Sequence, residues 1–287
     1  MNQPIVGIGE LLWDIYPDGR KVAGGAPFNF AFHCHQLGHE AIIVSRVGDD
    51  ELGRELRDEV KRLGLSDEFI QTDRDHPTGT VTVSLDENKM PTYTINENVA
   101  WDWIGSEGAC LDEGILHAVR SICYGSLALR SPGSRHSILG LVESVPWAIR
   151  VFDVNIRKPH VPSNGVLREC VDLANWIKAS DEDLAIADRL QSEDPDAEPQ
   201  TRIITRGRNG FEIRSDSGLS LDEPAIPANV IDTVGAGDAF TAAMVCLHLE
   251  GKPLRECARF ANRYAARVCE HQGATPRIDR TEVEAAL

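Results

Sequence analysis

Short runs of β-branched residues alternate along this chain with segments of helical character, and this alternation restricts the fold more than any other feature. Parallel strands need long crossover connections, and helices supply them on the faces of the sheet. The pattern therefore predicts an α/β protein with a mainly parallel sheet and helices on both faces. The expected strands are residues 5–9, 41–47, 121–124, 149–154, 176–178 and 202–205, and the expected helices are residues 27–37, 51–63, 236–249 and 254–270.

One region departs from this pattern, since residues 80–85 and 92–96 alternate polar and β-branched side chains with a period of two. Such alternation is typical of a hairpin with one exposed face. A second hairpin is predicted over residues 11–23, turning at the Pro-Asp-Gly sequence of residues 17–19. The two hairpins, at about residues 11–23 and 79–97, predict a small β lid over the α/β body. The alternative is surface decoration without a role in function.

Composition sets limits on the partners of the chain. It carries 29 Lys and Arg against 45 Asp and Glu, a net charge of −16 with neutral histidine. Nucleic acids and anionic membranes require stripes of basic residues, so neither is an expected partner. A small phosphate ligand remains compatible, because the N–H groups at a helix N-terminus bind anions whatever the net charge. The 42% of apolar residues can form a sizeable core, and we expect a single domain over residues 1–287.

The cysteines and the apolar segments indicate the compartment. The seven cysteines are scattered, and no two are spaced C-x-x-C. This pattern favours neither a disulfide framework nor a zinc ribbon, and it predicts small core residues. No basic, apolar leader is visible, and the most apolar stretch, residues 239–249, is too short to span a bilayer. A reduced cytoplasm is the expected location.

A glycine-rich turn followed by a long helix is the motif that points to chemistry. Residues 231–238, Ile-Asp-Thr-Val-Gly-Ala-Gly-Asp, lead into a helix expected from about Ala236. Glycines allow a ligand to approach the backbone closely, and the free N–H groups of the first helical turn favour negative charge. Asp238 places a carboxylate in the same turn. Anion-binding donors beside a base suit phosphoryl transfer to an alcohol. The alternative is that Asp238 only offsets the helix dipole and the glycines form an ordinary loop.

The full stretch resembles the C-terminal motif of the ribokinase-like carbohydrate kinases, the PfkB family. Near the N-terminus, residues 24–29 read Gly-Gly-Ala-Pro-Phe-Asn, which is most similar to the fructokinase-like branch of that family. The resemblance covers nearly the whole chain, and it implies a three-layer α/β/α sandwich with a small β-sheet lid. It also implies ATP-dependent phosphorylation of a sugar hydroxyl, with fructose as the first expectation. The other matching segments are residues 9–14, 37–38, 47–53, 124–127 and 153–157.

The resemblance implies a role for each matching residue on the sugar side. Asp238 matches the general base that takes the proton from the acceptor hydroxyl. Arg157 matches an Asn-x-Arg sequence that contacts the transferred phosphoryl group or the sugar, the alternative being a surface ion pair. The anion hole for the γ-phosphoryl group matches Gly235, Ala236 and Gly237, and the positions that hold sugar hydroxyls match Asp14, Gly24, Gly25 and Asn29.

The resemblance extends to the nucleotide and its ions. Ser180 and Asp183 stand where the family commonly has Asn-x-x-Glu near the magnesium–phosphate site, and Asp183 is the expected contact to Mg²⁺ through water. Asp232 resembles one member of the K⁺ loop of potassium-activated relatives. The implied cofactors are therefore ATP, Mg²⁺ and, through this loop, K⁺. The remaining nucleotide-binding positions are Thr205, Gly207 and Gly210 in an ATP-side loop, Asn262 near adenine and Gly273 in the turn that follows.

Several alternatives remain open from the sequence. A ketodeoxygluconate kinase and a nucleoside kinase share the implied fold, and a non-catalytic sugar-binding regulator would keep it as well. The intact Gly-Ala-Gly-Asp sequence favours catalysis. A homodimer through the lid is an expected assembly, since exposed sheet edges invite pairing. Trp101 and Trp103 follow the lid segment, and either cover the sugar or anchor the lid.

Overall fold

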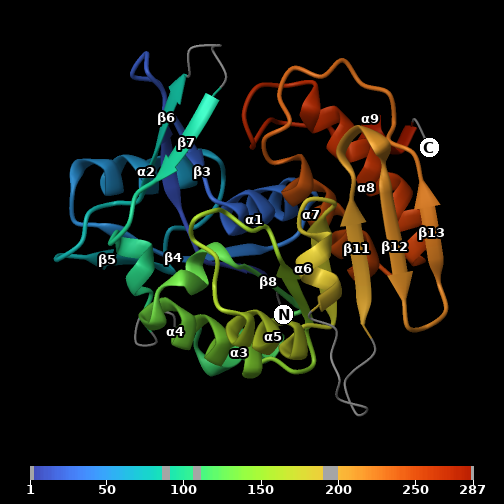
Figure 1. Cartoon of the computed structure of the whole chain (residues 1–287), viewed down its shortest axis with the longest axis horizontal. Coiled ribbons are helices and arrows are strands. Elements are labelled where there is room, and N and C mark those ends of the chain that lie inside the picture. Colours follow the sequence, from blue (N-terminus) through green and yellow to red (C-terminus); the bar gives the residue numbers. More distant parts are fainter. Residues whose placement is uncertain (1–2, 86–90, 106–110, 190–199, 286–287) are drawn as a thin grey trace.

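The computed structural model describes residues 3–85, 91–105, 111–189 and 200–285, and within them a nine-stranded sheet runs through the centre (Figure 1). The strands from β11 to β5 pair in parallel, which confirms the predicted α/β class. In order across the sheet they are β13 (Ser220–Glu223), β12 (Phe211–Ser215), β11 (Thr201–Thr205), β10 (Trp176–Ser180), β9 (Ile149–Asp153), β8 (Ser121–Gly125), β1 (Ile5–Ile8), β4 (Ala41–Gly48) and β5 (Ile70–Asp73).

The sequence does not predict β5, β12 or β13, which lie at the two edges of this sheet. β12 and β13 pair antiparallel to the rest, and the sequence Phe-Glu-Ile-Arg-Ser of β12 alternates apolar and polar side chains. β5 reads Ile-Gln-Thr-Asp, and β13 reads Ser-Leu-Asp-Glu. β5 and β13 are edge strands, and β12 buries only one of its faces, so none of the three has the apolar run that marks a strand buried on both faces.

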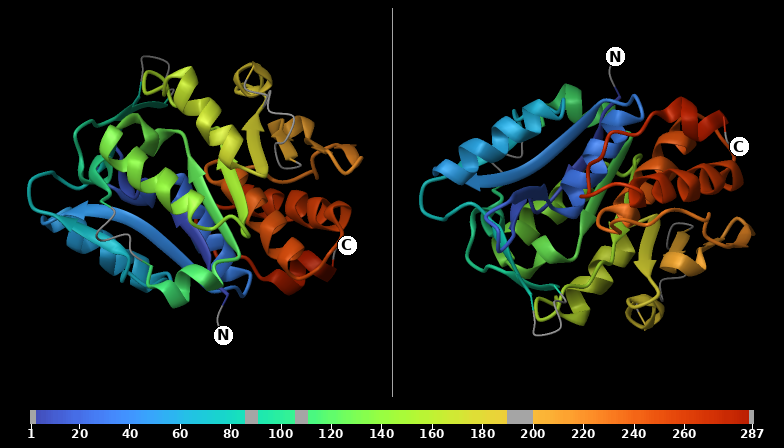
Figure 2. Two further views of the ribbon diagram at one scale, coloured as in Figure 1. Left: turned by 90° about the horizontal axis from the view of Figure 1, so that it is seen from below. Right: turned by 90° about the horizontal axis from the view of Figure 1, so that it is seen from above.

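Helices form a layer on each face of the sheet (Figure 2). Successive side chains of a strand point to opposite faces. Ile5 accordingly packs in one core layer, and Val6 packs in the other. The first layer contains α1 (Ala26–Gln36), α2 (Glu51–Arg62), α7 (Ala236–Leu249), α8 (Leu254–Cys269) and α9 (Arg280–Ala285). The second contains α3 (Glu113–Ala118), α4 (Pro132–Glu143), α5 (Asn164–Leu173) and α6 (Leu184–Arg189), with the 3₁₀ turns η1 (Ala100–Trp103) and η2 (Leu127–Arg130).

A second sheet, of four strands in the described part of the chain, stands apart from the central sheet (Figure 1). We call this sheet the lid. Its two antiparallel hairpins are joined by the parallel pairing of β2 with β6. The expected turn between residues 85 and 92 lies mostly outside the described residues, which omit 86–90. The lid strands are β3 (Lys21–Gly24), β2 (Leu12–Ile15), β6 (Thr80–Leu85) and β7 (Pro91–Ile95).

Residues 48–53, within the matching segment 47–53, hold in place the stretch of chain that enters the lid. The Asp50 carboxylate caps α2 by accepting a hydrogen bond from the Gly53 N–H at 2.7 Å. The same carboxylate accepts the Thr78 N–H and hydroxyl at 2.8 and 2.7 Å. The Thr78 hydroxyl oxygen also accepts the Gly48 N–H at 2.9 Å. These contacts give the Gly-Asp-Asp stretch at residues 48–50 a structural role, because they hold the chain just before β6.

The cysteines of the described residues carry free thiols. Cys269 is half-buried, and Cys110 lies outside the described residues. The buried thiols are Cys34, Cys123, Cys170, Cys246 and Cys257, as expected for small core residues. None of the helices in the described ranges has the length and apolar character needed to cross a lipid bilayer.

Candidate active site

Asp238 lies in the first turn of α7, directly after a left-handed glycine. Gly235 is the N-cap of this helix and has a φ of 78°. A Cβ atom at Gly235 would lie 2.7 Å from both the Cα and the Cβ of Ala274, so only glycine fits there. The turn therefore leaves the N–H groups of the helix N-terminus free of side-chain caps, as an anion site requires.

The carboxyl group of Asp238 is held from α1. The Asn29 amide donates a hydrogen bond to Asp238 Oδ2 at 2.8 Å. Burial raises the pKa of Asp238 to about 6, and the nearby Asp153 adds to the rise. Lys178, the Asn29 hydrogen bond and Arg157 act in the opposite direction. A carboxyl group with a pKa this close to neutrality suits general base catalysis.

The expected sugar-binding residues converge where the lid meets α1. Gly25 is the N-cap of α1 with a φ of 119°, and a Cβ there would lie 2.2 Å from the Glu10 carbonyl oxygen. A Cβ on Gly24 would lie 3.0 Å from Asp14 Oδ2, which places the Asp14 carboxylate over this turn. Burial raises the pKa of Asp14 to about 6, while Arg157 opposes the rise. Asn29 Oδ1 is buried without a hydrogen-bond partner in the described residues, so this acceptor remains available.

Arg157 is an exposed cation facing a group of carboxyls. It follows β9, next to Asn155 and Ile156, and Asn155 has a φ of 30°. Burial raises the pKa of Glu10, Asp14, Asp153 and Asp238, and the charge of Arg157 opposes this rise in all four. No ion pair of Arg157 is formed within the described residues, and its role stays a prediction.

Lys178 and Asp153, to which the sequence assigns no role, form a buried ion pair next to Asp238. Lys178 Nζ is 3.1 Å from both carboxylate oxygens of Asp153, and both residues are buried. A cavity of about 10 Å³, with room for roughly one water molecule, has Asp153 and Asp238 in its wall. A lysine within the apolar strand Trp-Ile-Lys-Ala-Ser is the signal that could have revealed the pair, because a buried charge needs a partner.

Glu10 is a third buried residue without a predicted role. It follows β1, and its Oε1 atom accepts the Ala26 N–H at the start of α1 at 3.2 Å. Its Oε2 atom has no hydrogen-bond partner in the part of the chain described. Burial raises the pKa of Glu10 to about 7, and Asp238 contributes to this rise. The Glu10 carboxyl therefore stabilises the turn at Gly24 and Gly25 through its hydrogen bond with the Ala26 N–H.

The nucleotide-side residues fall into two groups. Ser180 and Thr205 end the neighbouring strands β10 and β11, so they lie at the same edge of the sheet. The Ser180 hydroxyl donates to Asp183 Oδ2 at 2.9 Å, and the Asp183 N–H donates back to the Ser180 oxygen at 3.2 Å. Gly207, with a φ of 51° and open space around its Cα, begins the turn after β11.

Gly210 and Asn262 form the second group, at the segment after β13. A Cβ on Gly210 would lie 2.0 Å from the Glu223 carbonyl oxygen, which explains the glycine. The Asn262 amide donates to the Pro224 carbonyl oxygen at 2.8 Å and so fixes this segment against α8.

Asp232 joins the two loops that flank Gly235. Its Oδ1 atom accepts the Val234 N–H at 3.0 Å, and its Oδ2 atom accepts the Gly273 N–H at 2.9 Å. Gly273 has a φ of 83°. The carboxylate therefore sets the relative position of the Gly235 turn and the loop that follows α8.

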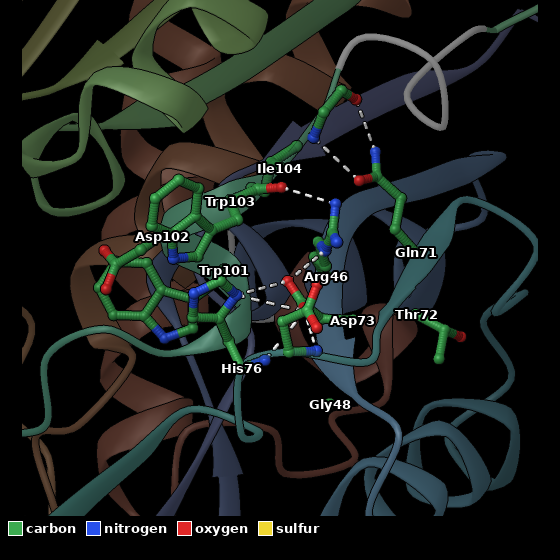
Figure 3. A network of polar contacts seen from close by, with 12 residues as sticks. Arg46, Gly48, Gln71, Thr72, Asp73, His76, Trp101, Asp102, Trp103 and Ile104 are labelled. Carbon is green, nitrogen blue, oxygen red and sulfur yellow. Dashed lines mark hydrogen bonds and ion pairs between the residues drawn. The ribbon is translucent and has the colours of Figure 1, made fainter.

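The contacts of the two tryptophans support the anchoring interpretation. Trp101 is buried, with the Arg130 guanidinium carbon 4.0 Å from its ring centroid. Trp103 stacks on His76 with 4.6 Å between ring centroids. Figure 3 shows Arg46 bridging Asp73 and the carbonyl oxygen of Trp103, at 2.7 and 2.9 Å. This network ties η1 to β4 and β5.

Comparisons with known proteins find relatives that span most of this chain. A model of the pfkB family of carbohydrate kinases matches residues 16–280. A Pyrococcus horikoshii protein named as a sugar kinase is 30% identical over 96% of this chain and 93% of its own. A Klebsiella pneumoniae fructokinase is 30% identical over 85% of this chain and 84% of its own. A crystal structure of the P. horikoshii sugar kinase with ATP superposes with a TM-score of 0.85 at 29% identity, covering 97% of this chain and 96% of that one.

Proposed function

Since this chain belongs to the pfkB family of carbohydrate kinases, we propose that it phosphorylates a hydroxyl group of fructose, with Asp238 as the general base. The chain is an ATP-dependent sugar kinase, a phosphotransferase that acts on a sugar hydroxyl. Fructose is proposed as the sugar because relatives named fructokinase match most of the chain. They also place it in the fructokinase-like branch.

The observation that carries the proposal is the Asp238 carboxylate at the start of α7. Its pKa of about 6 leaves it largely ionised at neutral pH, and it remains basic enough to accept a proton as the hydroxyl attacks. The hydrogen bond from Asn29 fixes which oxygen is engaged, since Oδ2 accepts it. The other oxygen is then proposed to face the acceptor hydroxyl.

Sugar binding is proposed at the turn between the lid and α1. The Asp14 carboxylate can accept two hydroxyl donors, and the unpartnered Asn29 Oδ1 can accept another. Gly24 and Gly25 let a polyol lie against the backbone. These groups would orient the sugar with its reacting hydroxyl at Asp238, which turns a bimolecular encounter into a positioned reaction.

The γ-phosphoryl group is proposed to meet the N–H groups of Gly235, Ala236 and Gly237. These donors carry no side-chain cap and lie at the positive end of the α7 dipole. They can stabilise the negative charge on the phosphoryl oxygens during transfer. Arg157, which lies within electrostatic reach of Asp14 and Asp238, would add a positive charge to the same region.

The donor set fits a water-mediated Mg²⁺ ion better than a dedicated metal cage. In the described residues no three His, Cys, Asp or Glu side chains cluster as a metal site. Asp183 offers a hard carboxylate oriented by Ser180, which suits Mg²⁺ held chiefly by phosphates and water. Bound Mg²⁺ would neutralise charge on the β- and γ-phosphates. We also propose K⁺ near Asp232, because this carboxylate holds the Gly235 turn and the loop at Gly273 together by accepting an N–H from each.

The test is a screen of sugars with purified protein, ATP and Mg²⁺, each with and without K⁺, following ADP release. Fructose should give the highest kcat/KM. A preference for 2-keto-3-deoxygluconate or for a nucleoside would replace the proposed substrate but keep the reaction. Calorimetric sugar binding without ADP release under any condition would instead indicate a non-catalytic sugar-binding regulator.

The Asp238→Asn variant tests the base. We expect kcat to fall by several orders of magnitude, because the amide cannot accept the proton, while the affinity for ATP changes little. The measurement is steady-state kinetics together with calorimetric titration of ATP. Turnover near that of the unmodified enzyme would remove Asp238 from this role.

We further propose that two copies pair through the lid. The lid edges β3 and β7 have no neighbouring strand in the described residues, and such edges can pair with a second chain. Sedimentation velocity should then give the mass of a dimer of this 31.5 kDa chain, and a monomer at micromolar concentration would contradict the proposal.

A further inference from the structure

The buried ion pair joins Asp153, the last residue of β9, to Lys178 in the middle of the neighbouring strand β10. The two residues are register partners in the pairing of β10 with β9. Only 6% of Lys178 and 3% of Asp153 is exposed. Burial lowers the pKa of the Lys178 ammonium, but Asp153 and Asp238 raise it above its usual value overall, so Lys178 is positively charged.

The Lys178 ammonium reaches the first turn of α7. A Cβ atom placed on Gly237 would lie 3.0 Å from Lys178 Nζ and 3.5 Å from Lys178 Cε. The ammonium therefore packs against the backbone between Gly235 and Asp238, on the inner side of the turn. A Cβ atom at position 237 would therefore make a tight contact with the ammonium, which would have to shift slightly.

Stability alone does not explain such a pair. Taking two charges out of water is unfavourable, and replacing a buried pair by apolar residues is often neutral or stabilising. The neighbouring residues of both strands are apolar and buried, so an apolar pair would suit the surroundings. A charge retained against the proposed anion hole suggests a role in the reaction.

Every element packed around Asp238 contributes a polar or charged group. Asp153 from β9 and Glu10 from the end of β1 are the neighbouring acids, and Arg157 and Lys178 are the neighbouring cations. Asp183 interacts with Lys178 from the end of β10. Asn29 from α1 and the thiol of Cys123 from β8 complete the set. Lys178 also lies against the backbone of the turn that carries Asp238, at Gly237.

We propose that Lys178 and Asp153 are positioning residues for phosphoryl transfer, which together support the first turn of α7 and set the pH at which Asp238 becomes a base. The inference rests on the proposed function of Asp238. The pair acts through Asp238 and the Gly237 backbone, and neither member needs to touch the sugar or ATP.

The two members act on Asp238 in opposite directions. Asp153 raises the pKa of Asp238, whereas Lys178 lowers it. Loss of the Lys178 charge should therefore move the acidic limb of the kcat profile to higher pH. Loss of the Asp153 charge should move the same limb to lower pH. A purely structural pair would give a lower plateau or a lower melting temperature without opposite shifts.

The experiment measures kcat from pH 4.5 to 9 with saturating ATP, Mg²⁺ and the best sugar of the screen. We expect Lys178→Met to raise the midpoint of the acidic limb by about one pH unit, and Asp153→Asn to lower it, as neighbouring charges typically do. Shifts in the same direction, or unchanged midpoints in both variants, would overturn the proposal.

A matched control uses a second buried ion pair that does not face Asp238. Arg130 and Asp102 lie 2.8 Å apart with little exposed surface. Asp102→Asn leaves an unpaired buried cation, as Asp153→Asn does, and it should lower stability without moving the acidic limb. If it moves the limb as far as Asp153→Asn does, the shift is a general effect of destabilisation and the proposal fails.

The charge-reversed double variant Asp153→Lys/Lys178→Asp covers the case in which single variants do not fold. It keeps the ion pair and the net charge but removes the ammonium from the side of Gly237. The acidic limb should again move to higher pH, and an unmoved limb would contradict the inference.

Failure of the inference can be told apart from failure of the proposed base. If Asp238→Asn keeps its activity, the proposed function of Asp238 is wrong whatever the pair does. The titration of Asp238 can also be followed without substrate, from the pH dependence of the difference in unfolding free energy between each variant and the same variant carrying Asp238→Asn. The pH dependence of this free-energy difference should move to higher pH in Lys178→Met and to lower pH in Asp153→Asn. If it does not move, the role of the ion pair is rejected and the role of Asp238 is not affected.

Discussion

The carboxyl groups of this site are held in environments that disfavour their charged forms. Burial is the first cause for Glu10, Asp14 and Asp238, and each pKa lies well above its ordinary value. A buried carboxylate without full compensation destabilises the folded state, and substrate binding can use that stored energy. If these carboxyl groups form the active site as proposed, they gain reactivity at the expense of the stability of the free enzyme.

Glu10 gives the clearest measurable consequence at the scale of one residue. Its pKa rises from 4.5 in a free side chain to about 7 in the folded protein, so the folded state binds its proton more tightly. The contribution of Glu10 to stability is therefore present below pH 4.5 and is lost as the pH rises through about 7. A shift of this size corresponds to about 3 kcal/mol.

We expect Glu10→Gln to be more stable than the unmodified protein at pH 8, by up to about 3 kcal/mol, because the amide carries no charge to bury. The amide oxygen can still accept the Ala26 N–H. Urea unfolding at pH 4.5, 6 and 8 measures the difference, which should shrink as the pH falls. A constant difference at all three pH values would show that Glu10 is not buried in its charged form.

The two ends of α7 allow a comparison at the scale of a secondary-structure element. Gly235 before the helix and Gly251 after it both have positive φ, at 78° and 83°. A Cβ at Gly235 would meet the backbone of Ala274 at 2.7 Å, whereas a Cβ at Gly251 would meet nothing within 4 Å. A residue with a side chain would therefore be strained by the positive φ at either position. It would clash with a neighbouring segment only at Gly235, in the proposed anion hole.

We expect Gly251→Ala to destabilise the protein by about 1 kcal/mol and to leave kcat unchanged. Gly235→Ala should destabilise it by more, and it should also lower kcat at least tenfold, because the N–H groups of the first turn must move. Thermal unfolding and steady-state kinetics of the two variants provide the test. Equal losses in both variants would mean that the Gly235 turn has no catalytic role.

Elements bounded by strong local signals could be predicted from the sequence. The helices expected at 236–249 and 254–270 agree with α7 and α8 to within one residue, since glycine and proline separate them at Gly251 and Pro253. β12 and β13 have no such signal, because their side chains alternate or are mostly polar. The pairing of β2 with β6, which joins two predicted hairpins into one lid, depends on contacts between distant segments.

The candidate site shows the same division. Asp238, Asn29 and Gly25 belong to local motifs, and the structure brings them together. Lys178 and Asp153 belong to separate strands, and only the register of β9 against β10 makes them partners. The register of two strands cannot be read from a single sequence. The sequence could therefore show that Lys178 lies in an apolar strand, but it could not show that Asp153 is its partner.

At the scale of the whole molecule, the lid is anchored to the body by Arg130. Its guanidinium group donates to both carboxylate oxygens of Asp102 at 2.8 Å and to the Asn96 carbonyl oxygen at 2.7 Å. Asn96 directly follows β7, so the contact joins η2 to the end of the lid. A bidentate arginine fixes geometry as well as charge.

Arg130→Lys should loosen this anchor without leaving Asp102 unpaired. A lysine keeps one ion pair, but it cannot bridge Asp102 and Asn96 as the planar fork does. If closure of the lid shields the transferred phosphoryl group from water, this variant should raise the KM for the sugar several-fold, leave the KM for ATP nearly unchanged, and increase ATP hydrolysis relative to sugar phosphorylation. Arg120→Lys is the control, since Arg120 donates to Gln3 on the exposed surface. Equal effects of the two substitutions on the ratio of hydrolysis to transfer would argue that the anchor at Asn96 does not control access of water to the reaction.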